Sequence, residues 1–237
     1  MSVKIIGYLS FGYPTIEKSI ERADIYIKAG CDFLEVDFPT DNAYLDSDFI
    51  GGRMKAAMEA CDDFDKYFKG IETLKEKYPN TPIILLAYEH TIKAIGVEKF
   101  IKRCKELETY DLIMVGLENE DIKNQLIKEG IKISCWVPFD LPEENVTSAL
   151  ASNGFVYLQS KSGGKEKEGY ETLDKCIKYL RERGIKNPIY CGVGVSTRED
   201  IVRIEKAGAD AAFIGSALLK QETDEDIINY IQSLKSN

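Results

Sequence analysis

The sequence predicts an α/β protein, specifically a (β/α)8 TIM barrel in which eight parallel strands alternate with helices. Short apolar or β-branched runs alternate with longer amphipathic segments along the whole chain, and glycines follow several of the helical segments. The length of 237 residues is close to the ~250 that such a barrel typically takes. A doubly wound open sheet is the alternative, although it rarely uses eight consecutive units.

The expected strands are short runs rich in valine, isoleucine, leucine and aromatic residues, each placed between helical patterns. Because strand and helix patterns alternate in this way, we expect eight β/α units whose parallel strands form a barrel. In chain order they are Ile5–Ser10, Asp32–Phe38, Pro82–Leu86, Leu112–Val115, Lys132–Trp136, Phe155–Leu158, Pro188–Cys191 and Ala211–Ile214.

The expected helices have apolar residues at three- and four-residue spacing. Glycine follows several of them where a left-handed C-cap is needed, as in Ala29-Gly30 and Ala207-Gly208. A Lys-Ala-Gly-x-Asp unit recurs there, which hints at internal repetition, and no linker-like tract divides residues 1–237, so we expect a single domain. The helices include Thr15–Ala29, Val97–Leu107, Glu120–Glu129, Glu143–Ala151, Tyr170–Arg183, Arg198–Ala207 and Asp224–Leu234.

Composition excludes several classes of protein. The chain is 44% hydrophobic and 30% charged, which argues against disorder. Its net charge of −9 is the wrong sign for binding nucleic acid or an anionic membrane surface. The six cysteines are dispersed without a CxxC pair and His90 is the single histidine, so we expect reduced thiols and no metal site. With no signal-peptide pattern and no apolar run of ~20 residues, a cytoplasmic location is expected.

The second expected strand carries two carboxylates on one face. Alternation places Leu34, Val36 and Phe38 against helices and turns Glu35 and Asp37 into the barrel. Burial raises the pKa of a carboxyl group toward the range where it can both give and take a proton. The residues alone leave both a catalytic and a structural role open for Glu35. The acidic loop that follows, residues 40–48, is typical of a solvated surface and lacks EF-hand spacing.

Glycines follow the last two expected strands. Backbone N–H groups there, together with a short helix that begins at Gly215-Ser216, would form the phosphate site common in such barrels; tight turns are the alternative. The loop of residues 159–169 fits a lid or an ordinary flexible loop equally well. We expect His90 to be exposed or hydrogen-bonded and Trp136 to lie in the core.

Several motifs in order resemble the tryptophan synthase alpha subunit family, from the first strand to the last helix. The two glycine loops belong to the match. The other matching stretches are Phe11-Gly12-Tyr13-Pro14, Phe33-Leu34-Glu35-Val36-Asp37-Phe38-Pro39, Leu85-Leu86-Ala87-Tyr88 and Tyr157-Leu158-Gln159-Ser160-Lys161-Ser162-Gly163.

The resemblance implies a lyase that splits indole-3-glycerol phosphate into indole and glyceraldehyde 3-phosphate. Glu35 matches the catalytic glutamate of the family motif Glu-Leu-Gly-x-Pro, Asp46 the catalytic aspartate eleven residues later, and Tyr157 the tyrosine beside the glutamate. It also implies a beta subunit as partner, with pyridoxal phosphate bound only there and no cofactor in this chain. The implied substrate-binding residues are Tyr8, Tyr88, Lys161, Gly163, Gly192, Gly194, Gly215 and Ser216.

The chain departs from the family pattern in loops that serve closure and signalling to the beta subunit. Only Asp46 remains of the loop after strand two, Gly116-Leu117-Glu118-Asn119 replaces Ala-Asp-x-Pro after strand four, and Lys161 replaces an arginine. The family usually has a helix before strand one, whereas this sequence begins almost at the strand. Two alternatives therefore stay open: another phosphate-binding barrel isomerase or aldolase, and a catalytically weak barrel that acts mainly as a partner of the beta subunit.

Overall fold

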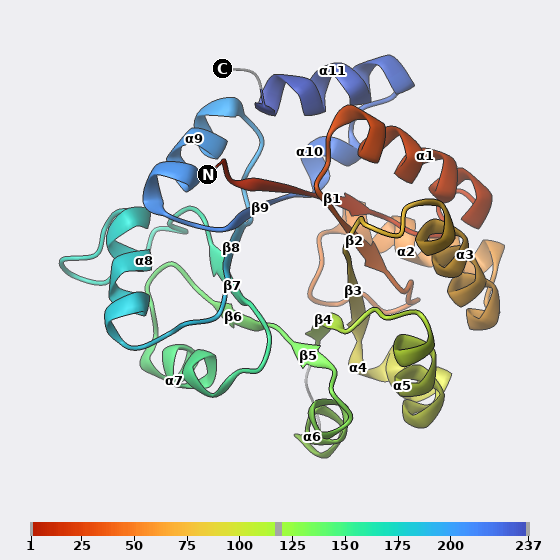
Figure 1. The fold of residues 1–237 in the computed structure, drawn as a ribbon, viewed down its shortest axis with the longest axis horizontal. Coiled ribbons are helices and arrows are strands. Elements are labelled where there is room, and N and C mark those ends of the chain that lie inside the picture. Colours follow the sequence, from red (N-terminus) through yellow and green to blue (C-terminus); the bar gives the residue numbers. More distant parts are fainter. Residues whose placement is uncertain (1, 117–119, 236–237) are drawn as a thin grey trace.

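Parallel strands form the centre of the computed structural model, which describes residues 2–116 and 120–235, and the helices lie outside them (Figure 1). The sheet order is β5-β4-β3-β2-β1-β9-β8-β7-β6, and every hydrogen-bonded strand pair is parallel. The predicted fold class is thereby confirmed. The strands are β1 (Lys4–Leu9), β2 (Phe33–Asp37), β3 (Ile83–Tyr88), β4 (Asp111–Val115), β5 (Lys132–Ile133), β6 (Cys135–Val137), β7 (Val156–Gln159), β8 (Ile189–Gly192) and β9 (Ala211–Ile214).

The fifth predicted strand is divided in two, so the described residues contain nine strands instead of eight. β5 pairs with β4 and β6 pairs with β7. The change of partner falls at Ser134, whose N–H donates to Leu112 on one side, while the next N–H donates to Phe155 on the other. Gly154 permits this change, because a Cβ there would lie 2.4 Å from the carbonyl oxygen of Ile133. The barrel thus closes through the continuous chain at Ser134.

Local sequence signals explain where the helices begin and end. The Thr15 hydroxyl accepts from the N–H of Lys18 at the start of α1, and Gly30 ends that helix in the left-handed region with φ of 115°. A capping box of Thr197 and Asp200 starts α9. The helices are α1 (Ile16–Ala29), α2 (Asp48–Ala60), α3 (Phe64–Lys77), α4 (Glu89–Ile95), α5 (Val97–Glu106), α6 (Glu120–Lys128), α7 (Glu143–Ala151), α8 (Leu173–Glu182), α9 (Arg198–Ala207), α10 (Ser216–Leu219) and α11 (Asp224–Lys235).

The core has two layers, as strand alternation predicts. Leu34 and Val36 of β2, and Phe38 directly after it, belong to the larger cluster, which lies between the strands and the helices. A smaller cluster of inward-facing side chains fills the barrel, among them Ile6, Ile84, Leu86, Ile113, Phe155 and Phe213. Across residues 2–116 and 120–235, no helix is both long and apolar enough to cross a membrane.

Phe100 of α5 packs in an aromatic cluster next to the end of β2, and its contribution to stability can be tested. Phe100 is 0% exposed and lies 5.7 Å, centroid to centroid, from Phe38. Replacing it by alanine should leave a cavity and lower the free energy of unfolding by about 3–5 kcal/mol. The matched control is Phe49→Ala on α2, where the ring is 39% exposed, and we expect a loss of about 1 kcal/mol or less. Urea denaturation measures both, and equal losses would contradict this description of the core.

Candidate active site

A cavity of about 950 Å³ opens at the carboxyl ends of the strands. It is lined by inward-facing residues near the strand ends and by the loops that follow them, which is where barrel enzymes place their active sites. The structure brings most of the sequence-predicted residues to this cavity. Tyr8, Glu35, Asp46, Tyr157, Gly194, Gly215 and Ser216 all line it.

Glu35 presents a carboxyl group to this cavity without a hydrogen-bond partner among the described residues. Its side chain comes from β2 and lies beside Tyr8 of β1 in the parallel register, and only 5% of its surface is exposed. Burial, followed by the nearby charges of Asp37 and Asp46, raises the pKa of Glu35 to about 8. With its pKa raised to about 8, the carboxyl group is mostly protonated at neutral pH.

Asp37, two residues further along β2, is buried in a different way. Its carboxylate accepts a hydrogen bond of 2.6 Å from the Tyr8 hydroxyl and a short one from the N–H of Phe11. Burial raises the pKa of Asp37 to about 7, against the lowering effect of these two donors. Burial and the same carboxylate raise the pKa of the Tyr8 phenol well above its usual value. The Tyr8 hydroxyl is therefore a fixed donor to Asp37.

Asp46 reaches the cavity from the loop before α2, where a tyrosine of β3 holds it. The Tyr88 hydroxyl donates to the Asp46 carboxylate over 2.7 Å and accepts from the N–H of Leu45. Partial burial raises the pKa of Asp46, and the bond from Tyr88 opposes that rise. Tyr88 thus contributes to the site by orienting Asp46 and does not itself line the cavity.

Aromatic rings form one wall of the cavity. Tyr157 stacks on Phe213 with centroids 4.4 Å apart and meets Trp136 edge-on at 5.2 Å. The expectation that Trp136 lies in the core is wrong. Trp136 is 40% exposed and lines the cavity, because the short strand β6 turns it toward the cavity and away from the helices. Phe213 is a second wall residue that the sequence reasoning did not single out.

The glycines after β7 and β8 have different roles. Gly192 does not line the cavity; it lies behind Tyr157, and a Cβ at this position would be 2.3 Å from that ring. Its lack of a side chain is what lets the ring of Tyr157 sit where it does. Gly194 lines the cavity directly and adopts a φ of 78°. Gly163 is exposed and lines neither of the cavities described here.

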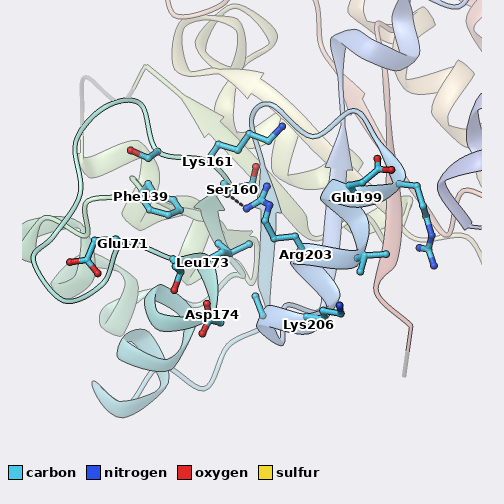
Figure 2. Close-up of a pocket in the computed structure, with 14 residues that line it drawn as sticks. Phe139, Ser160, Lys161, Glu171, Leu173, Asp174, Glu199, Arg203 and Lys206 are labelled. Carbon is cyan, nitrogen blue, oxygen red and sulfur yellow. Dashed lines mark hydrogen bonds between the residues drawn. The ribbon is translucent and has the colours of Figure 1, made fainter.

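Lys161 borders a second pocket of about 950 Å³, on the outside of the barrel between α8 and α9 (Figure 2). Its ammonium group forms an ion pair of 2.8 Å with Asp200. Figure 2 shows the hydrogen bond that the guanidinium of Arg203 donates to the carbonyl of Ser160. The stem of Lys161 also covers Gly194, since a Cβ there would lie 3.3 Å from its Cδ atom. Lys161 thus stands at the boundary between the two pockets.

Other sequence expectations can be placed as well. His90 is hydrogen-bonded, with Nε2 2.6 Å from the hydroxyl of Thr40. All six cysteines carry free thiols. Within residues 2–116 and 120–235, no group of three histidine, cysteine, aspartate or glutamate side chains is arranged to hold a metal. Of the altered loop after β4, Leu117, Glu118 and Asn119 lie outside the described residues.

Comparison with known proteins agrees with this geometry. The family model for the tryptophan synthase alpha chain matches residues 2–236. The chain belongs to the tryptophan synthase alpha chain family. Among its relatives, the tryptophan synthase alpha chain of Aquifex aeolicus is 29% identical, with 98% of this chain and 91% of the relative covered. The alpha chain of Caldicellulosiruptor saccharolyticus is 27% identical, with 98% and 92% covered. The chain is therefore a divergent family member.

Solved structures show the same fold. A protein from Aquifex aeolicus superimposes with a TM-score of 0.87 at 27% identity, covering 99% of this chain and 92% of that one. The tryptophan synthase α2β2 complex of Pyrococcus furiosus contains a chain that superimposes with a TM-score of 0.81 at 23% identity, covering 98% and 97%. The barrel is thus that of the family along nearly its whole length.

The glycine loops of this family member lead to a prediction about anion binding. Ser216, the first residue of α10, lines the cavity beside Gly215 and Gly194, and the first N–H groups of a helix have no acceptor within it. In a crystal soaked in inorganic phosphate, we expect the anion between Gly194 and Gly215. Soaking Ser216→Pro, which lacks the N–H, should lower its occupancy. An anion bound only in the outer pocket would contradict the assignment.

Proposed function

We propose that this protein cleaves indole-3-glycerol phosphate to indole and glyceraldehyde 3-phosphate by a retro-aldol reaction, as the alpha subunit of tryptophan synthase in tryptophan biosynthesis. The observation that carries this proposal is the buried carboxyl of Glu35, which accepts no hydrogen bond from the described residues and lines an aromatic-walled cavity of about 950 Å³. Breaking the bond to indole C3 requires a proton at that carbon, and Glu35, which lines the cavity, would supply it.

Glu35 would act as acid and then as base. Its proton goes to indole C3, and the carboxylate that remains takes the proton of the hydroxyl on the adjacent glycerol carbon. As the aldehyde carbonyl forms, the carbon–carbon bond breaks and its electron pair returns to the indole ring. The proton released by the hydroxyl restores the acid form of Glu35, so the cycle has no net proton change.

Asp46 and the glycine loops would position and stabilise the substrate. The Asp46 carboxylate can stabilise positive charge that develops at the indole nitrogen, and Tyr88 fixes its orientation. The phosphate would lie on the N–H groups at Gly194, Gly215 and Ser216, which need no net positive charge to bind an anion. This acid–base route uses no cofactor in this chain.

The stacked pair of Tyr157 and Phe213, with Trp136 beside it, favours a flat bicyclic ring over a bare sugar phosphate. That lining distinguishes the lyase from an isomerase or aldolase acting on a smaller sugar phosphate. The proton-holding Glu35 and the oriented Asp46 argue against a barrel that has lost its chemistry.

The partner we propose is a tryptophan synthase beta subunit, to which pyridoxal phosphate would be confined. The structural relative from Pyrococcus furiosus is part of an α2β2 complex. We place the reaction in the cytoplasm, because all six cysteines carry free thiols, the state that a reducing compartment maintains.

Replacing Glu35 by glutamine keeps the shape of the side chain but removes the transferable proton. We expect the rate of indole release from indole-3-glycerol phosphate to fall by ~10²-fold or more, with and without a beta subunit. The matched control is Glu21→Gln on the exposed face of α1, which should keep the wild-type rate. If Glu35→Gln retains full activity, Glu35 is not the acid; if the wild type releases no indole under either condition, the lyase proposal is wrong.

Replacing Asp46 by asparagine tests the charge near the indole nitrogen. We expect a loss of ~10²-fold in kcat, because the neutral amide stabilises the developing positive charge poorly. Tyr88→Phe should cost less, since it removes only the hydroxyl that orients Asp46. Asp41→Asn, an exposed position in the same loop, serves as the control. Equal rates for Asp46→Asn and Asp41→Asn would rule out this role.

A further inference from the structure

Asp37 is a buried carboxylate that the reaction described above does not use. It stands where the family motif Glu-Leu-Gly-x-Pro has glycine, two residues after Glu35. Residues two apart on a strand share a face, so both carboxyl groups of β2 enter the barrel interior. Both are almost fully buried, with exposed fractions of 5% for Glu35 and 1% for Asp37.

The two carboxyl groups differ in their hydrogen bonds. Asp37 accepts from the Tyr8 hydroxyl at one oxygen and from the N–H of Phe11 at the other, whereas no described residue donates to Glu35. Donors of this kind stabilise the ionised form of a carboxyl group. Two buried carboxyl groups on one strand face hold a single negative charge more easily than two. The donors therefore decide which of the two is charged.

We propose that Asp37 is a positioning residue of this active site: held by Tyr8 and Phe11, it carries the negative charge of the pair and so keeps the transferable proton on Glu35. The inference rests on the proposed lyase function. During the reaction Asp37 keeps its charge, while the proton leaves Glu35 for indole C3 and returns from the substrate hydroxyl.

The other titratable groups around Glu35 are consistent with this division. Tyr8 of β1, Asp46 before α2, Tyr157 of β7 and Lys220 after α10 line the same cavity. Burial and the neighbouring carboxylates keep the phenols of Tyr8 and Tyr157 neutral, with pKa values well above the usual range. The pKa of Asp37, which accepts two hydrogen bonds, is about 7, and that of Glu35, to which no described residue donates, is higher, at about 8.

The test is the pH dependence of kcat/KM for indole release in Asp37→Asn. Removing the charge lowers the pKa of Glu35, so the alkaline limb of the profile, near pH 8 in the wild type, should move at least one pH unit lower. At pH values above the alkaline limbs of both proteins, kcat/KM of Asp37→Asn should be ~10-fold or more below that of the wild type. At pH values below both limbs, it should stay within a few-fold of wild type. The matched control is Asp111→Asn at the start of β4, whose limb should coincide with that of the wild type.

If Asp37→Asn lowers kcat/KM equally at all pH values and leaves the alkaline limb at the wild-type pH, the proposal is overturned and Asp37 has only a structural role. Tyr8→Phe gives a second variant that keeps the ring but removes one donor to Asp37, and its limb should move in the same direction by less.

A measurement without turnover separates this inference from the function on which it rests. The infrared C=O band of protonated Glu35, identified by its loss in Glu35→Gln, can be titrated in the free protein. Its midpoint should be lower in Asp37→Asn than in the wild type, and identical midpoints would overturn the role of Asp37. If the wild type releases no indole, the lyase proposal fails, and the band titration still decides whether Asp37 sets the protonation of Glu35.

Discussion

The cost of burying carboxyl groups inside the barrel is the constraint on which the site depends. Moving a charge from water into a protein interior costs several kcal/mol unless nearby groups compensate. The face of β2 cannot be reversed to avoid this cost, because Leu34, Val36 and Phe38 would then leave the core. Glu35 and Asp37 must therefore point inward. One is stabilised by hydrogen bonds and the other by holding a proton.

The neighbouring strands supply what this constraint requires. The parallel register of β1 and β2 sets Tyr8 beside Glu35, within reach of Asp37, and the chain leaving β1 brings the N–H of Phe11 to the same carboxylate. Tyr88 of β3 does the same for Asp46. Two aspartates are thus each held by a tyrosine hydroxyl, whereas none of the described residues donates to Glu35. Pairs of acids whose surroundings differ in this way take different roles, one as a fixed charge and one as a proton carrier.

How far the sequence predicts this protein depends on the range of the interaction involved. Strand alternation is a local property, and it correctly placed both carboxylates of β2 inside the barrel. The division of the fifth strand depends on Gly154, about twenty residues away, and a three-residue strand is too short for alternation to indicate the face of Trp136. Likewise, the role of Gly192 is set by the ring of Tyr157 on another strand. Such contacts appear only once the chain is folded.

The loop between Gly192 and Gly194 borders the proposed phosphate site of this acidic chain. Val193 adopts a φ of 64°, which is strained for a β-branched residue and costs ~1–3 kcal/mol. The Ser160 hydroxyl donates to the carbonyl of Val193 over 2.7 Å, and Arg203 holds the carbonyl of Ser160 from the outer pocket. These bonds hold the strained loop in place, with Gly194 facing the cavity before any ligand arrives. In the proposed site, backbone N–H groups bind the phosphate locally, so binding needs no excess of basic side chains in a chain with a net charge of −9.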